Sequence, residues 1–93
     1  MFVKLHKISQ HVSGEFYLSE VIVNTSHITY ISEDVLMKQS LSEGKINLGL
    51  NKITQFTKIK MTSNRGIDEM TVVGDIGFIE SKINMSSKKL LRS

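Results

Sequence analysis

The fold is decided by one stretch of the sequence, which reads FTKIKMTSNRGIDEMTVVGDIGFIESKINMSSKKLL from Phe56 to Leu91. Near its start, Ile59 and Met61 alternate with polar residues, which is the period of two expected of a strand with one buried and one wet face. The polar segment 63–66 then contains residues that tolerate turn conformations, and an apolar run follows it. The stretch therefore predicts a β-hairpin whose second strand returns antiparallel to the first.

The same stretch ends in a predicted helix. Asp75 follows Gly74 at the position of an N-cap, where its carboxylate can accept from the unpaired amides of the first turn and is favoured by the helix dipole. One narrow stripe of this helix is expected to face the sheet, and it consists of Ile76, Ile79, Ile83 and Leu90. Phe78 and Met85 point roughly away from that stripe, so the helix either contacts something on both sides or frays after Asn84.

The first third of the chain predicts three further strands. Residues 2–8 read as the first, residues 15–24 as a strand with a bulge or a break, and residues 27–31 as a short strand with Ile28 and Tyr30 on one face. The predicted fold class is α+β and mainly β, an antiparallel meander of hairpins with a C-terminal helix packed on the sheet.

Residues 32–55 show no sustained period, and we expect a long loop or insertion there. Ser32 and the acidic residues after it could cap a short helix through Lys38, but the segment 40–44 breaks any longer one. The segment is too apolar for a disordered linker, so it is expected to pack somewhere.

Length and composition set the outer bounds. A chain of 93 residues is expected to form a single domain, 1–93, in which residues 85–93 make a frayed basic tail. The sequence contains no Cys, which excludes disulfides and thiolate sites and favours a reducing cytoplasm. Neither a signal peptide nor a run of 18 apolar residues is present, so we expect a cytoplasmic protein without a membrane partner.

Residues with the chemistry of active sites are scattered. His6, His11 and His27 lie on different segments without a metal-ligand spacing, and no serine stands in a nucleophile elbow. Adjacent carboxylates such as Glu33 and Asp34 point apart on a strand or a helix. We therefore predict no catalytic residue, no cofactor or metal site and no small-molecule substrate, and we expect that the protein is not an enzyme.

Several segments carry a family resemblance. They are Val3-Lys4-Leu5, Val21 to Ile28 with its Asn24 turn, Phe56 to Ile59, and Val72 to Asp75 leading into Ile79 to Ile83. In this order they resemble the flagellar and swarming-motility small proteins and similar short proteins of unknown function from tailed phages. The resemblance covers most of the chain in outline, although residues 32–55 depart from the shortest members. It implies a meander with a terminal helix, a phage origin and binding to host machinery, and it brings no catalytic site.

The net charge of +3 lies entirely in residues 57–93. A basic surface draws polyanions by counterion release, so nucleic-acid binding is one hypothesis. Its candidate residues are Lys58, Lys60, Arg65, Lys82, Lys88, Lys89 and Arg92. Most aromatic residues lie in other segments, which argues against it, because single-stranded nucleic acids are usually bound by stacking on aromatic side chains.

Protein interaction is the leading hypothesis. Apolar side chains left outside one small core generally mark an interface, and the candidates here are Ile46, Leu48, Leu50, Phe56, Phe78 and Met85. The partner is expected to be a second copy of the chain, a host protein, or both. The apolar segment 46–56 could cover a sheet edge of its own chain or of a neighbouring copy, and the second arrangement is favoured because it adds area to a small core.

Overall fold

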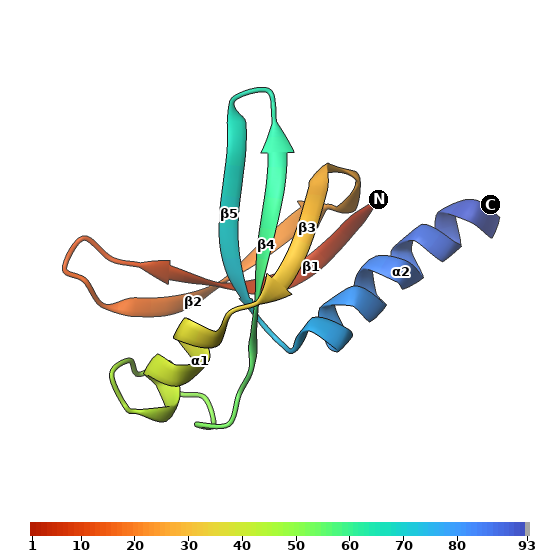
Figure 1. Ribbon diagram of the computed structural model, residues 1–93. Coiled ribbons are helices and arrows are strands. Elements are labelled where there is room, and N and C mark those ends of the chain that lie inside the picture. The colour runs from red at the N-terminus through yellow and green to blue at the C-terminus, as the bar shows by residue number, and fades with distance from the viewer. Residues whose placement is uncertain (93) are drawn as a thin grey trace.

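The computed structural model describes the backbone of residues 1–92 and the side chains of residues 1–85. Its elements are β1 (Phe2–Gln10), β2 (Phe16–Asn24), the 3-10 turn η1 (Thr25–His27), β3 (Ile28–Glu33), α1 (Val35–Ser42), β4 (Phe56–Ser63), β5 (Gly66–Val73) and α2 (Ile76–Arg92). All strand pairs are antiparallel. The predicted fold class is confirmed: a mainly β, α+β domain with a C-terminal helix on the sheet (Figure 1).

The five strands form one sheet in the order β2-β1-β5-β4-β3. The two edge strands, β2 and β3, are consecutive in the chain and are joined by η1, but they do not pair with each other; the first and last strands, β1 and β5, pair instead. β1 and β5 pair only at Lys7 and Val72, and Figure 1 shows the β1–β2 hairpin crossing the other three strands at this point. The sheet is therefore two ribbons, and the core lies between them.

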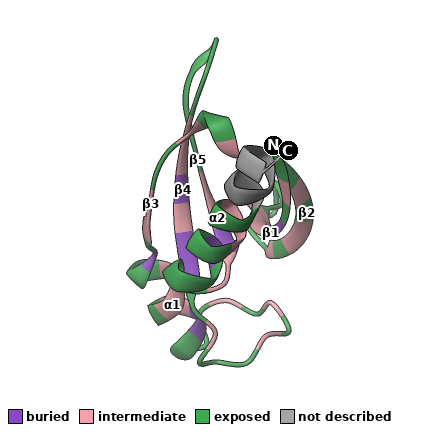
Figure 2. Ribbon diagram, turned by 90° about the vertical axis from the view of Figure 1, so that its right-hand side faces the viewer, coloured by how far each residue is buried: buried purple, intermediate pink, exposed green. Residues whose placement is uncertain are grey.

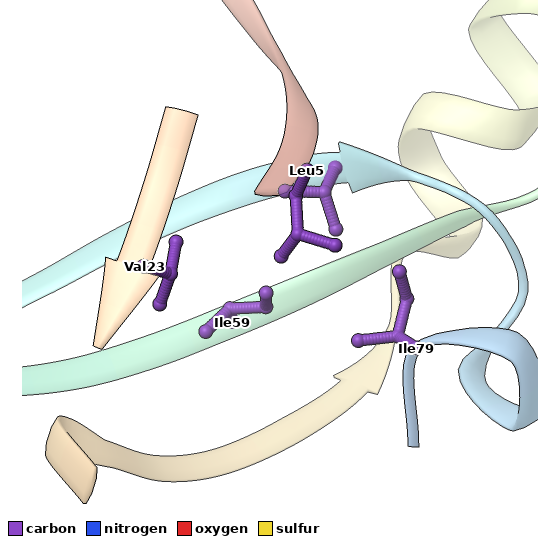
Figure 3. Close-up of a cluster of buried hydrophobic side chains, with 5 residues drawn as sticks. Leu5, Val23, Ile59 and Ile79 are labelled. Carbon is purple, nitrogen blue, oxygen red and sulfur yellow. The ribbon is translucent and has the colours of Figure 1, made fainter. Parts of the chain in front are cut away.

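The core is built from one or two side chains of each element that reaches it. Leu5, Val23, Ile59, Val72 and Ile79 are buried together, and Figure 3 shows the labelled members from β1, β2, β4 and α2 directed toward one another. Ile83 packs against this cluster. Ile76 is 39% exposed, so the prediction that it lies on the buried stripe is wrong; it belongs to the first turn of α2, ahead of the core. Leu90 lies outside the residues whose side chains are described.

The prediction of a long loop over residues 32–55 is wrong for its first half. β3 extends to Glu33, and α1 follows at once because Asp34 caps it: the Met37 amide donates to Asp34 Oδ1 at 3.0 Å. The hydroxyl of Thr71 donates to the other carboxylate oxygen at 2.6 Å, which ties the cap to β5. The buried carboxylate thus has two donors, as a buried charge requires.

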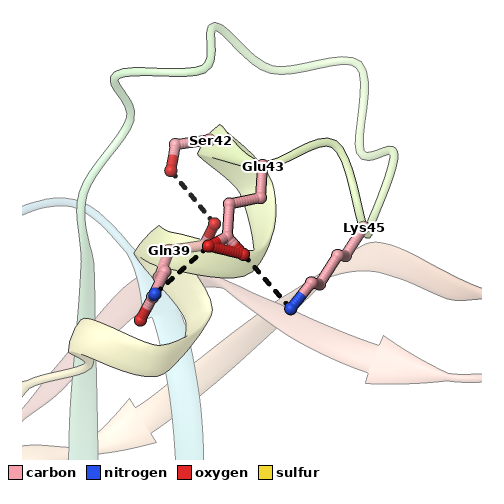
Figure 4. A network of polar contacts seen from close by, with 4 residues as sticks. All are labelled: Gln39, Ser42, Glu43 and Lys45. Atoms are coloured by element: carbon pink, nitrogen blue, oxygen red, sulfur yellow. Dashed lines mark hydrogen bonds and ion pairs between the residues drawn. The ribbon is translucent and has the colours of Figure 1, made fainter.

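The end of α1 is fastened by local polar contacts. The Gln39 side chain donates to Glu43, the Ser42 hydroxyl donates to the Gln39 carbonyl, and Lys45 pairs with Glu43 at 3.1 Å (Figure 4). The irregular segment 43–55 begins after this network. The predicted loop is therefore real over its second half only.

β3 contains a bulge that simple strand alternation does not predict. Ile28 pairs with Met61, but Tyr30 pairs with Lys60, so the register shifts by one residue between them. Since one residue of shift turns a side chain to the other face, Ile28 and Ile31 pack on the core while Tyr30 is exposed. The prediction that Ile28 and Tyr30 share a face is wrong.

Candidate interaction surfaces

The histidines that the sequence singled out lie apart in the described part of the chain. No group of three or more His, Asp or Glu among the described residues could hold a metal ion. His11 stacks on Tyr17 at the β1–β2 hairpin with ring centroids 4.1 Å apart, while His27 belongs to η1. His6, His11 and His27 thus lie on separate parts of the fold, in β1, at the β1–β2 turn and in η1.

The first surface is an exposed stripe on α2, which we define by Phe78, Lys82 and Met85 and call the helix stripe. Phe78 is 52% exposed and Met85 62% exposed. The ammonium group of Lys82 lies 5.0 Å from the centre of the Phe78 ring, a cation–π distance. The spacing of three to four residues puts the three side chains on one face, and Ile79 points from the other face into the core.

The residues just before α2, Gly74 and Asp75, set where the helix begins and pack against Phe78. The Phe78 amide donates to Asp75 Oδ1 at 2.7 Å, which confirms the predicted N-cap. Gly74 has a φ of +123°, and a Cβ there would lie 2.7 Å from Phe78 Cδ2. The Phe78 ring therefore packs over Gly74, where a Cβ would force the ring to shift.

The predicted interface residues of the segment 46–56 lie elsewhere. Ile46, Leu48 and Leu50 are half-buried, and Ile46 lines a cavity with Phe16 and other residues of the β1–β2 turn but none of α2. Phe56 is completely buried in β4, so its assignment to an exposed interface is wrong. The segment approaches the turn of its own β1–β2 hairpin at Ile46, whereas Ile53 is 78% exposed; Figure 2 shows its intermediate and exposed positions.

The second surface is the outer face of β4, which we call the basic face and define by Tyr30, Lys58 and Lys60. Lys58 pairs with Glu69 at 3.7 Å, which offsets its charge. Lys60 lies over the exposed ring of Tyr30, 5.3 Å from its centre. The bulge in β3 thus places an aromatic ring beside the cations, which reasoning from strand alternation missed; two isoleucines three residues apart, Ile28 and Ile31, are the only trace of it in the sequence.

The predicted nucleic-acid residues do not form one surface. Ile59 and Ile79 meet in the core, and Lys58 and Lys60 alternate with Ile59, so the basic face looks away from α2 and its Lys82. Arg65 lies at the tip of the β4–β5 hairpin and lines a shallow hollow there with His27. Lys88, Lys89 and Arg92 lie outside the residues whose side chains are described. The backbone of the predicted basic tail continues α2 as far as Arg92, and Met85 is the one residue of the tail whose side chain is described.

Comparison with known protein families, with curated protein sequences and with solved structures found no match. The resemblance to the motility and phage small proteins therefore remains an expectation from the sequence. Among the described residues, α1 and α2 both lack the length and apolar character needed to span a bilayer. The helix stripe and the basic face are the features of the described residues that bear on function.

Proposed function

We propose that this chain is a non-enzymatic interaction module that docks on another protein through the helix stripe. The observation that carries the proposal is the exposure of Phe78 and Met85 on one face of a helix whose opposite face already supplies the core. Helices that bind in grooves present anchors at such spacings, and aromatic and Met side chains are typical anchors.

The charge of the stripe indicates the kind of partner. Lys82 stands between the two apolar anchors, so a second helix stripe of the same kind would bring like charges together. A partner with an apolar groove bordered by carboxylates would instead bury Phe78 and Met85 and neutralise the cation. The resemblance to phage proteins points to a host protein as the source of that groove.

Replacing Phe78 by Lys should abolish capture of the partner. The experiment compares affinity capture from host lysate by the wild type and by Phe78→Lys, each with and without nuclease. The control is Phe2→Lys, because Phe2 is also a well-exposed phenylalanine, 66% exposed, on β1. We expect a protein band retained by the wild type and the control, and reduced at least about tenfold with Phe78→Lys.

A band that both variants retain equally would contradict the assignment to the helix stripe. A band that disappears with nuclease would point to the second candidate function. The far-ultraviolet circular dichroism of Phe78→Lys should match the wild type, since half of the side chain is already in water.

The second candidate function is binding of single-stranded nucleic acid on the basic face. The observation that favours it is the exposed ring of Tyr30 beside Lys60, since such sites combine a stacking platform with cations. We propose it as the alternative because Lys58 is already paired and few other aromatic side chains are present on this face.

Titrations with a single-stranded RNA and with heparin separate the two contributions of this face. Replacing Lys58, Lys60 and Arg65 by Ala should weaken binding to both polyanions and lower the salt dependence by roughly one unit per lost phosphate contact. Tyr30→Ala should weaken RNA binding by about 1–3 kcal/mol through lost stacking and leave heparin binding unchanged. Tyr30→Phe, which keeps the ring, should restore RNA binding. Equal effects of Tyr30→Ala on both ligands would rule out a stacking role.

A further inference from the structure

The outer edge of β2 has the properties of a pairing edge. β2 is nine residues long, pairs only with β1 along an unbroken register, and contains no Pro. The opposite edge strand, β3, is shorter and bulged, which is a common way of blocking further pairing. The two edges of this sheet are therefore not equivalent.

The hydrogen bonds at the two ends of the hairpin show which backbone groups face outward. The His11 amide donates to the Glu15 carbonyl at 2.8 Å, and the Thr25 amide donates to the Met1 carbonyl at 2.9 Å. Hydrogen-bonded and non-hydrogen-bonded pairs alternate in an antiparallel ladder, and both of these bonds join odd-numbered residues in the same register. The even-numbered residues of β2 therefore point their N–H and C=O groups away from β1.

These outward groups belong to Phe16, Leu18, Glu20 and Ile22. In the described part of the chain, no backbone group outside the strand ladders bonds to them. Their side chains lie on the outer face of the hairpin. Phe16 and Leu18 are half-buried there, Phe16 beside Ile46, while Ile22 is 66% exposed and Glu20 pairs with Lys4 at 3.4 Å. The edge thus offers a row of donors and acceptors flanked by apolar side chains.

We propose that this edge pairs antiparallel with the β2 edge of a second copy of the chain, about a two-fold axis at Ser19. This register sets Phe16 opposite Ile22 of the second copy twice, which is a favourable aromatic and β-branched pair. It also sets Leu18 opposite Glu20 twice, at the exposed edge where Glu20 already pairs with Lys4 of its own chain. It forms about eight hydrogen bonds between the two edges. The inference goes beyond the proposed function, because β2 is not part of the helix stripe.

Registers with the two-fold axis at a neighbouring residue place less favourable side chains opposite each other. An axis at Glu20 would set the two Glu20 carboxylates directly opposite each other, and like charges in that position are destabilising. An axis at Val21 would set Leu18 against Asn24 and Glu20 against Ile22, which loses both apolar pairs. An axis at Leu18 would shorten the overlap of the two strands and replace both Phe16–Ile22 pairs by Phe16–Glu20 pairs.

Sedimentation measures the assembly. At high micromolar concentration, the wild type should have twice the chain mass of 10.5 kDa. Ile22→Lys should raise the dimer dissociation constant at least about tenfold, because a charge on an edge opposes pairing. Ile67→Lys is the matched control. Ile67 is also well exposed, at 65%, but it lies on β5, which is an interior strand between β1 and β4. A monomeric wild type, or a dimer weakened equally by both variants, would overturn the proposal.

Cysteine variants test the register separately. Because the chain has no Cys, each of Leu18→Cys, Ser19→Cys, Glu20→Cys and Val21→Cys carries a single thiol. In the proposed register, Ser19 of one chain lies opposite Ser19 of the other chain in a non-hydrogen-bonded pair. The two Cα atoms of such a pair are about 4.5 Å apart, which is close enough for a disulfide. We expect Ser19→Cys to give a covalent dimer under mild oxidation faster than the other three. Faster crosslinking at another position would overturn the register.

Phe78→Lys should leave the dimer intact, because Phe78 is not part of the β2 edge. Failure of the proposed docking function can therefore be distinguished from failure of this pairing.

Discussion

Replacing Ile79 by Asp should unfold the domain. The side chain of Ile79 is completely buried and lies between the two ribbons of the sheet, where it meets Leu5 and Ile59. An aspartate there loses the transfer free energy of the isoleucine and places a carboxylate among apolar groups, at a combined cost of at least about 4 kcal/mol. That cost approaches the whole stability expected of a domain of this size.

Chemical denaturation followed by circular dichroism measures this effect. The matched control is Ile67→Asp, because the same substitution at a position 65% exposed buries no charge and should cost less than about 1 kcal/mol. Native-like stability of Ile79→Asp would mean that α2 does not close the core, and it would remove the physical basis for assigning the helix stripe to the surface.

Replacing Phe56 by Ala should also be strongly destabilising. Phe56 begins β4 and is completely buried, although it lies outside the cluster of Leu5, Val23 and Ile79. Truncation of a buried phenylalanine costs about 3–5 kcal/mol, because the lost transfer free energy is joined by the cavity left behind. The same substitution at Phe78, which is 52% exposed, should cost about 1 kcal/mol.

The pair of variants separates packing from binding. Phe56→Ala should lower the free energy of unfolding, while Phe78→Ala should keep most of the stability and weaken capture of the partner. If Phe56→Ala left the stability unchanged and abolished capture instead, the residue would be an interface residue after all, as reasoning from the sequence proposed.

The local elements were determined by the sequence alone. Alternation around Ile59 identified the inward and outward faces of β4, and the polar turn after it produced the hairpin with β5. Asp75 after Gly74 identified the start of α2, and the Asp75 cap is present. These features could be predicted because each depends on residues within one turn or one strand pair, where backbone geometry and side-chain period leave few alternatives.

The surfaces were decided by the tertiary structure. The apolar character of Phe56 did not distinguish core from interface, because burial depends on how β4 is covered by the rest of the fold. The bulge in β3 turned Tyr30 toward Lys60, and only the pairing of β3 with β4 specifies that shift of register. The cations of residues 57–85, close in sequence, were divided between two faces because β4 and α2 meet through their apolar sides. Charge and apolar content can be counted along a chain, but which of them share a surface is determined by long-range strand pairing and packing.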